Sequence, residues 1–150
     1  MTTKIAMFAV LAVLAMAIGT GAGENLRLNT HLDYSSDSQD GPLITGEHMD
    51  EGAVAGVPNY IIVYGEGCFN SKRQARRTVS LYEKYKGRVN FVVVDLDQKR
   101  PPAQQQLVKE YYKGYIPHVV VLDKTGKAVY NSSGEVDESE ISAILDRALR

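Results

Sequence analysis

Short hydrophobic runs alternate with amphipathic stretches over the second half of the chain. The run at 61–63 (Ile-Ile-Val) is apolar and β-branched, which is typical of a strand covered on both faces. After it, Ala75, Val79 and Tyr82 recur at helical spacing. Gly87 is expected to end this helix, because glycine readily adopts the backbone conformation found after a helix C-terminus. The pattern therefore predicts a buried strand followed by an amphipathic helix.

A second strand–helix–strand unit follows the first. Strongly apolar runs at 89–95 and 119–122 predict two further strands. The double proline at 101–102 suits the first turn of a helix between them, where a missing N–H is tolerated. Ala103, Leu107, Val108 and Tyr111 give this helix its apolar face.

The C-terminal part of the pattern predicts a hairpin and a last helix. Residues 123–126 (Asp-Lys-Thr-Gly) form a turn signal, and 127–130 is expected to be the return strand. The helix is predicted to start at Asp137, whose carboxylate caps it while Glu140 reaches back. The order from Pro58 is thus β-α-β-α-β-β-α, which requires parallel pairing first and an antiparallel hairpin at the edge.

The N-terminus has the layout of a secretory signal peptide. Lys4 precedes an apolar run at 5–18, and small residues follow up to Gly23. The run is short for a membrane-spanning helix, which needs roughly 20 residues. We therefore expect residues 1–23 to be a signal peptide, with an uncleaved N-terminal anchor as the alternative. In either case the folded part is expected to be periplasmic or secreted.

Residues 24–42 are polar, include a serine-rich stretch and lack sustained periodicity. We therefore expect a flexible linker there, followed by one domain over residues 43–150. Leu43 and Ile44 are a possible opening strand of that domain.

Composition narrows the possible functions. The 150 residues fit one domain, and 17 basic against 18 acidic side chains give no bias toward nucleic acid. A single cysteine excludes an internal disulfide and any multi-cysteine metal site. His31, His48 and His118 lack metal-ligand spacing to one another, so we expect neither a metal nor another cofactor.

The cysteine lies where the first predicted strand passes into its helix. Gly65 and Gly67 form the turn, and Cys68 is then placed at the helix start. Unpaired N–H groups and the positive end of the helix dipole favour a thiolate there. The adjacent basic side chains are expected on the solvated helix face: Lys72, Arg73, Arg76 and Arg77.

Three segments, taken in order, resemble the thioredoxin superfamily. Gly-Cys-Phe-Asn-Ser-Lys at 67–72 lies where that family has Trp-Cys-x-x-Cys-Lys, and Val-Asp-Leu-Asp-Gln at 94–98 resembles its second core strand and turn. Tyr-Ile-Pro-His-Val-Val-Val-Leu-Asp at 115–123 is similar to the segment with the family's cis-proline. The resemblance covers about residues 58–149. It implies a three-layer α/β/α sandwich with a mixed central sheet and a closing antiparallel hairpin.

The resemblance also implies a substrate site. Pro117 is expected to have a cis bond to Ile116 and to lie beside Cys68. The backbone of Ile116 would then pair with an extended substrate segment, and Gly67 and Phe69 would border the same surface.

The departures from the family pattern concern the chemistry. Ser71 replaces the second cysteine, and a serine hydroxyl cannot resolve a mixed disulfide, so a dithiol reductase is excluded. Gly67 replaces the usual tryptophan, and Ile62 stands where many thioredoxins bury an aspartate. We expect Cys68 to be the nucleophile, with the Ser71 hydroxyl donating a hydrogen bond to it.

Two functions remain open. The first is monothiol exchange with client-protein or small-molecule disulfides, in which a mixed disulfide persists until an external thiol reductant resolves it. Disulfide isomerisation, deglutathionylation-like exchange and covalent capture of a client are its possible forms. The second is a non-catalytic module that binds extended peptides along Ile116 and Pro117. His118 is a candidate proton carrier near Cys68, although an ordinary hydrogen bond at the strand start is the favoured interpretation.

Overall fold

A computed structural model describes residues 21–150, so the predicted signal peptide lies outside the described residues except for 21–23. The elements in chain order are β1 (Glu24–Leu28), β2 (Ile44–Glu47), β3 (Asn59–Tyr64), α1 (Phe69–Tyr85), β4 (Asn90–Asp95), α2 (Pro102–Tyr111), β5 (His118–Leu122), β6 (Ala128–Ser133) and α3 (Glu138–Ala148). No helix within this range has the length and apolar character needed to cross a membrane.

The central sheet has four strands in the order β4-β3-β5-β6. β3 runs parallel to β4 and antiparallel to β5, so Val63 lies between Val94 on one side and His118 on the other. β6 pairs antiparallel with β5 and closes the sheet as a hairpin. The predicted mixed sheet with an antiparallel edge is confirmed.

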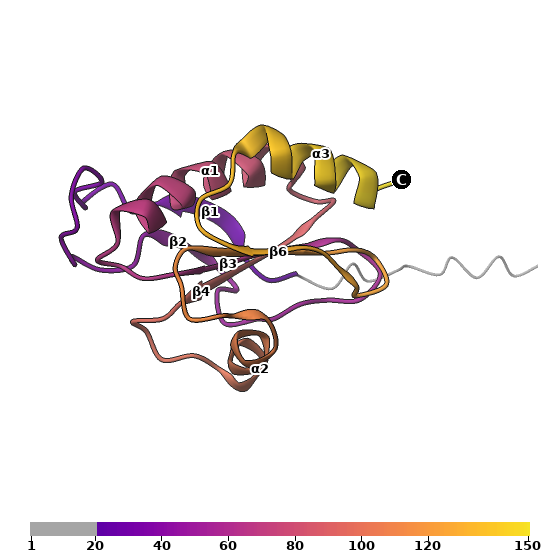
Figure 1. The fold of residues 1–150 in the computed structure, drawn as a ribbon, viewed down its shortest axis with the longest axis horizontal. Helices are drawn as coiled ribbons and strands as arrows, with labels where there is room; N and C mark the ends of the chain where they lie inside the picture. The colour runs from indigo at the N-terminus through magenta and orange to yellow at the C-terminus, as the bar shows by residue number, and fades with distance from the viewer. Residues whose placement is uncertain (1–20) are drawn as a thin grey trace, which may run out of the picture.

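Helices cover both faces of this sheet, with α1 and α3 on one face and α2 on the other (Figure 1). Alternate residues of β3 therefore enter different cores, because successive side chains of a strand point to opposite faces. Tyr60 and Ile62 belong to the core under α1 and α3, whereas Ile61 and Val63 pack in the core under α2. The fully buried strand β3 thus fixes the position of the turn that follows it.

The expected flexible linker at 24–42 is wrong, because this segment contains β1, which pairs antiparallel with β2. Leu26 is 3% exposed and packs in the core under α1, with half-buried Leu28 against it. The Asn25 N–H also donates a hydrogen bond to the Tyr82 hydroxyl at 2.8 Å. Burying one leucine contributes about 1.5–3 kcal/mol, and the pairing with β2 and the hydrogen bond to Tyr82 add to it.

The helix ends follow the sequence pattern with one exception. α1 ends at Tyr85, and Gly87 has a φ of +81°, as expected after a helix C-terminus. Asp137 is the N-cap residue of α3, but its side chain makes no capping hydrogen bond. Its carboxylate instead lies 3.5 Å from the Arg77 guanidinium. The predicted capping box is therefore wrong, because an ion pair with α1 takes the carboxylate.

Candidate functional site

Cys68 is the N-cap residue of α1, directly after β3 and the turn at 65–67. Its backbone is extended, with φ −112° and ψ 118°, and its Sγ accepts a hydrogen bond from the Ser71 backbone N–H at 3.5 Å. The residue is half-buried, so it is not sealed in the core. Free N–H groups and the positive helix end stabilise an anion at this point.

Ser71 is fully buried in the first turn of α1. Its Oγ accepts a hydrogen bond from the Gly65 N–H at 3.4 Å, which ties the helix to the preceding turn. We expected this hydroxyl to donate to the sulfur, but the bond that the structure shows to Sγ comes from the Ser71 backbone. Ser71 therefore supports the local geometry of Cys68.

The segment before β5 lies against the same turn. The Ile116–Pro117 bond is cis, as the resemblance implied, and Pro117 is buried. In the β3–β5 ladder Val63 pairs with His118, and continuing this register by two residues sets Gly65 opposite Ile116. A Cβ on Gly65 would lie only 2.5 Å from Ile116 Cδ1. The structure thus brings the Ile116–Pro117 segment against the turn that leads to Cys68.

Gly67 and Phe69 flank the cysteine and face a different segment, the loop between β1 and β2. A Cβ on Gly67 would lie 3.3 Å from Gln39 Cβ. The Phe69 N–H donates to Asp37 Oδ1 at 2.7 Å, and the Arg73 guanidinium lies 5.8 Å from the centre of the Phe69 ring. Their predicted role in substrate binding remains a prediction.

A buried acid pair lies beneath the turn. Asp95 at the end of β4 is 9% exposed, and Glu66 is 4% exposed. The Gln98 side chain donates to Glu66 Oε1 at 2.6 Å, and the Asp97 N–H donates to Asp95 Oδ1 at 2.9 Å. Asp95 Oδ2 has no hydrogen-bond partner among the described residues.

Burial, together with the neighbouring Glu66, raises the pKa of Asp95 to about 7, against the effect of the Asp97 N–H. Asp95 is therefore partly protonated near neutrality. The pair was not predicted from the sequence, although Asp95 lies in the family-like segment 94–98 and Glu66 is two residues before Cys68. The spacing of polar and apolar residues along the chain gives no sign that these two carboxyl groups are neighbours in the fold.

His118 is fully buried at the start of β5. Its Nδ1 lies 2.8 Å from Ser133 Oγ and its Nε2 lies 2.6 Å from Asn131 Oδ1, so β6 takes both ring nitrogens. Burial lowers the pKa of His118, which favours the neutral ring. The favoured interpretation, ordinary hydrogen bonding at a strand start, is confirmed.

The comparison with known families accords with this geometry. A model of the thioredoxin-like domain matches residues 46–149, more than two-thirds of the chain. The chain belongs to the thioredoxin-like domain family. One curated relative, the Thiol:disulfide interchange protein TxlA homolog of a Synechocystis species, is 29% identical over 143 residues, covering 91% of this chain and 74% of the relative.

Solved structures support the thioredoxin-like fold. A thioredoxin-like protein from Clostridium perfringens matches with a TM-score of 0.53 and 22% identity, covering 64% of this chain and 74% of its own. A malaria-parasite structure titled as thioredoxin-2, a component of the protein secretion machinery, matches with a TM-score of 0.52 and 15% identity, covering 61% and 82%. At these identities the likeness concerns the fold alone.

In this thioredoxin-like domain the loop between β1 and β2 wraps the side chain of Lys72. We expected Lys72 on the solvated helix face, but it is only 1% exposed. Its Nζ donates to the backbone oxygens of Asp33, Ser36 and Ser38 at 2.6, 2.8 and 2.7 Å. The expectation is wrong because a segment distant in sequence supplies three carbonyl acceptors to the ammonium.

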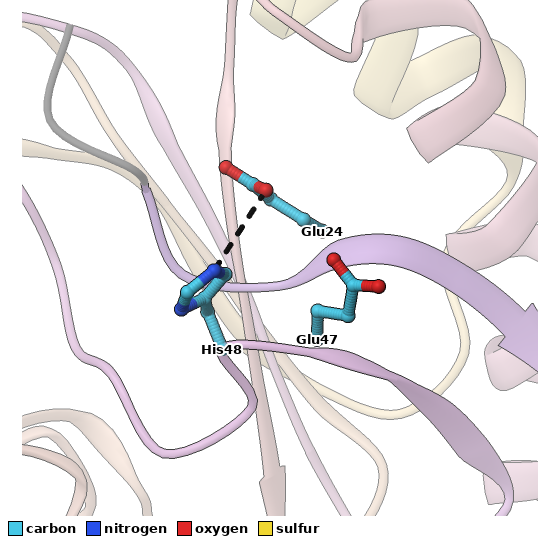
Figure 2. A group of neighbouring side chains, drawn as sticks. All are labelled: Glu24, Glu47 and His48. Atoms are coloured by element: carbon cyan, nitrogen blue, oxygen red, sulfur yellow. Dashed lines mark ion pairs between the residues drawn. The ribbon is translucent and has the colours of Figure 1, made fainter.

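One cluster has the residue types of a metal site. Ligand atoms of Glu24, Glu47 and His48 lie within 4.8 Å of one another. Figure 2 shows the ion pair between His48 and Glu24, which measures 3.9 Å, and His48 also lies 3.4 Å from Glu51. The side chains of Glu24, His48 and Glu51 are about 40% exposed, and Glu47 is exposed as well. Ion pairs to His48 explain the positions of Glu24 and Glu51, so we assign no metal to this surface cluster.

Proposed function

We propose that this thioredoxin-like protein carries out thiol–disulfide exchange outside the cytoplasm through the single thiol of Cys68. The position of Cys68 carries the proposal: a partly exposed sulfur caps α1, directly after the turn in which Gly65 lies against Ile116. Similarity to a thiol:disulfide interchange protein supports the reaction class. The signal-like pattern of residues 1–23 supports export.

The proposed reaction has two steps. The Cys68 thiolate attacks one sulfur of a substrate disulfide, so that a new S–S bond forms and the other substrate sulfur leaves with the electron pair of the broken bond. An external thiolate then attacks the mixed disulfide and releases Cys68 as a thiolate. Ser71 cannot perform this second step, so the external thiol reductant is an obligatory partner.

The proposed substrates are disulfides of client proteins or small molecules. An extended segment would pair with the backbone of Ile116, beside Pro117, while Gly67 and Phe69 border the sulfur on the opposite side of the turn. The contacts of Gly65 with Ile116 and of Gly67 with Gln39 support two walls around Cys68.

A second candidate function is peptide binding without catalysis, and the absence of a second thiol favours it. The variant Cys68→Ala separates the two functions. A peptide disulfide is incubated with each protein, and mass spectrometry quantifies adducts while calorimetry measures binding of a reduced peptide. Exchange predicts adducts on the wild type alone, with reduced-peptide binding similar in both proteins. Binding without any adduct on the wild type would favour the second function.

A further inference from the structure

A cavity lies between β2, the end of β4 and the first turns of α2. Its volume is about 350 Å³, near the lower end of the range of small-molecule sites, ~300–1,000 Å³. A cavity of this size suits a molecule built on a single ring. The apolar and aromatic part of its wall comes from Pro42, Ile44, Met49, Tyr64, Val93 and Pro101.

Asp95 brings a buried carboxyl to the border of this cavity. The residue is 9% exposed, its Oδ1 accepts from the Asp97 N–H, and its Oδ2 has no hydrogen-bond partner within residues 21–150. The neighbouring Glu66 is itself an acid, and its Oε1 already accepts from the Gln98 amide. An ionised carboxyl only accepts hydrogen bonds, so Glu66 leaves Oδ2 without a donor. An unpaired buried acceptor costs free energy, and a ligand that donates to it recovers that cost.

Arg100 brings a buried donor to the same cavity. Its Nη1 donates to the Leu96 backbone oxygen at 3.0 Å, whereas its Nε is buried and has no acceptor in the part of the chain that the structure describes. The cavity is therefore bordered by one residue with a spare acceptor and one with a spare donor. An amide group complements both, because it has an N–H to donate and a carbonyl oxygen to accept.

The charges around the cavity favour a ligand without a net charge. Two acidic residues, Asp50 and Asp95, and two basic residues, Lys99 and Arg100, border it. A cationic ligand would be repelled by the basic pair, and an anionic ligand by the acidic pair. A neutral molecule avoids both repulsions.

We propose that this cavity is a binding site for a small neutral amide with an apolar body. The amide N–H donates to Asp95 Oδ2, the amide carbonyl accepts from Arg100 Nε, and the apolar body packs against the apolar wall. The site is independent of the proposed exchange reaction, because its lining includes neither Cys68 nor Ile116.

Two neutral probes that differ in one group test the proposal. Benzamide has the amide, and acetophenone has a methyl group in place of the NH₂, so only benzamide can donate to Asp95. Each probe is titrated into the ¹⁵N-labelled protein at pH 8, where Asp95 is mostly ionised because its pKa is about 7. NMR shifts of the amides of Thr45, Gly46 and Gln104, which border the cavity, give the dissociation constants. Benzylamine, a cation of similar size, is titrated in the same way.

Three variants locate the two hydrogen bonds. Asp95→Leu removes the acceptor at a similar side-chain volume, and Asp50→Asn, which changes an exposed carboxylate at the same cavity, is its matched control. Arg100→Met removes the donor. Circular dichroism verifies that the variants fold, and the comparison of benzamide with acetophenone on the wild type needs no variant.

A hydrogen bond to a charged group corresponds to about tenfold or more in affinity. We expect the wild type and Asp50→Asn to bind benzamide about tenfold or more tightly than acetophenone, and Asp95→Leu to bind both alike. Arg100→Met should weaken both probes and keep the preference for benzamide. Equal binding of the two probes to the wild type, a preference that persists in Asp95→Leu, or tighter binding of benzylamine would overturn the proposal. If none of the probes shifts these amides, water alone occupies the cavity and the proposal is wrong.

Discussion

Replacing Asp95 by asparagine tests the buried acid pair through the pH dependence of stability. The folded-state pKa of Asp95 is raised from 3.8 to about 7, so the folded chain binds a proton more tightly than the unfolded chain. The contribution of Asp95 to stability is therefore fully present below about pH 4 and is lost as the pH rises from about 4 to 7, where Asp95 must ionise within the fold. Asp95→Asn removes this loss because its amide does not ionise.

The size of this pH-dependent change in stability follows from the pKa shift of Asp95. A rise of about 3 pH units corresponds to about 4 kcal/mol at 1.36 kcal/mol per unit. A cavity of about 350 Å³ borders Asp95 together with Tyr64 and Gln98, and water within it would screen the charge. We therefore expect about half of this value, roughly 2 kcal/mol, to be measured.

Urea unfolding at pH 4, 5, 6, 7 and 8, followed by circular dichroism, provides the assay. The unfolding free energy of Asp95→Asn minus that of the wild type should rise by about 2 kcal/mol from pH 4 to pH 8. Asp50→Asn, an exposed carboxylate bordering the same cavity, is the matched control and should show no comparable rise. A difference for Asp95→Asn that stays constant with pH would refute the raised pKa of Asp95.

Three further substitutions address the site. Ser71→Cys should allow an intramolecular disulfide with Cys68 and create dithiol reductase turnover, measured by insulin reduction; a variant that forms the disulfide without turnover would show that more than the second thiol is missing. Lys72→Met removes the ammonium that binds three loop carbonyls, so it should lower the unfolding free energy by about 2 kcal/mol and speed amide hydrogen exchange at 33–38. Unchanged exchange at 33–38 would contradict the role of Lys72 in holding this loop. Gly65→Ala should push the Ile116 side chain aside at a cost of about 1 kcal/mol and slow adduct formation with extended peptide disulfides; an unchanged rate would exclude Ile116 from the substrate surface.

The central sheet could be predicted because its signals are local. Runs such as Ile61–Val63 are apolar enough to indicate strands covered on both faces, and the hairpin turn at 123–126 has its own sequence signature. The position of Cys68 could also be predicted locally, because a strand followed by two glycines and a helix places the cysteine at the helix N-terminus.

The features that could not be predicted from the sequence depend on contacts between segments distant in the chain. The position of Lys72 in the sequence of α1 is typical of a solvated helix face. In the fold, however, residues 33–40 cover its side chain, and nothing in the sequence of α1 indicates this contact. The strand β1 was missed because most of its residues are polar or half-buried and only Leu26 is fully buried. Asp95 and Glu66 likewise meet only because parallel strands β3 and β4 end at the same edge of the sheet.

The most direct test of the account is the intact mass of the chain without residues 1–23 after incubation with oxidised glutathione. We expect one glutathione adduct on the wild type, none on Cys68→Ala, and complete loss of the adduct when an external dithiol is added. A wild-type chain that stays unmodified under conditions in which iodoacetamide labels Cys68 would contradict monothiol exchange.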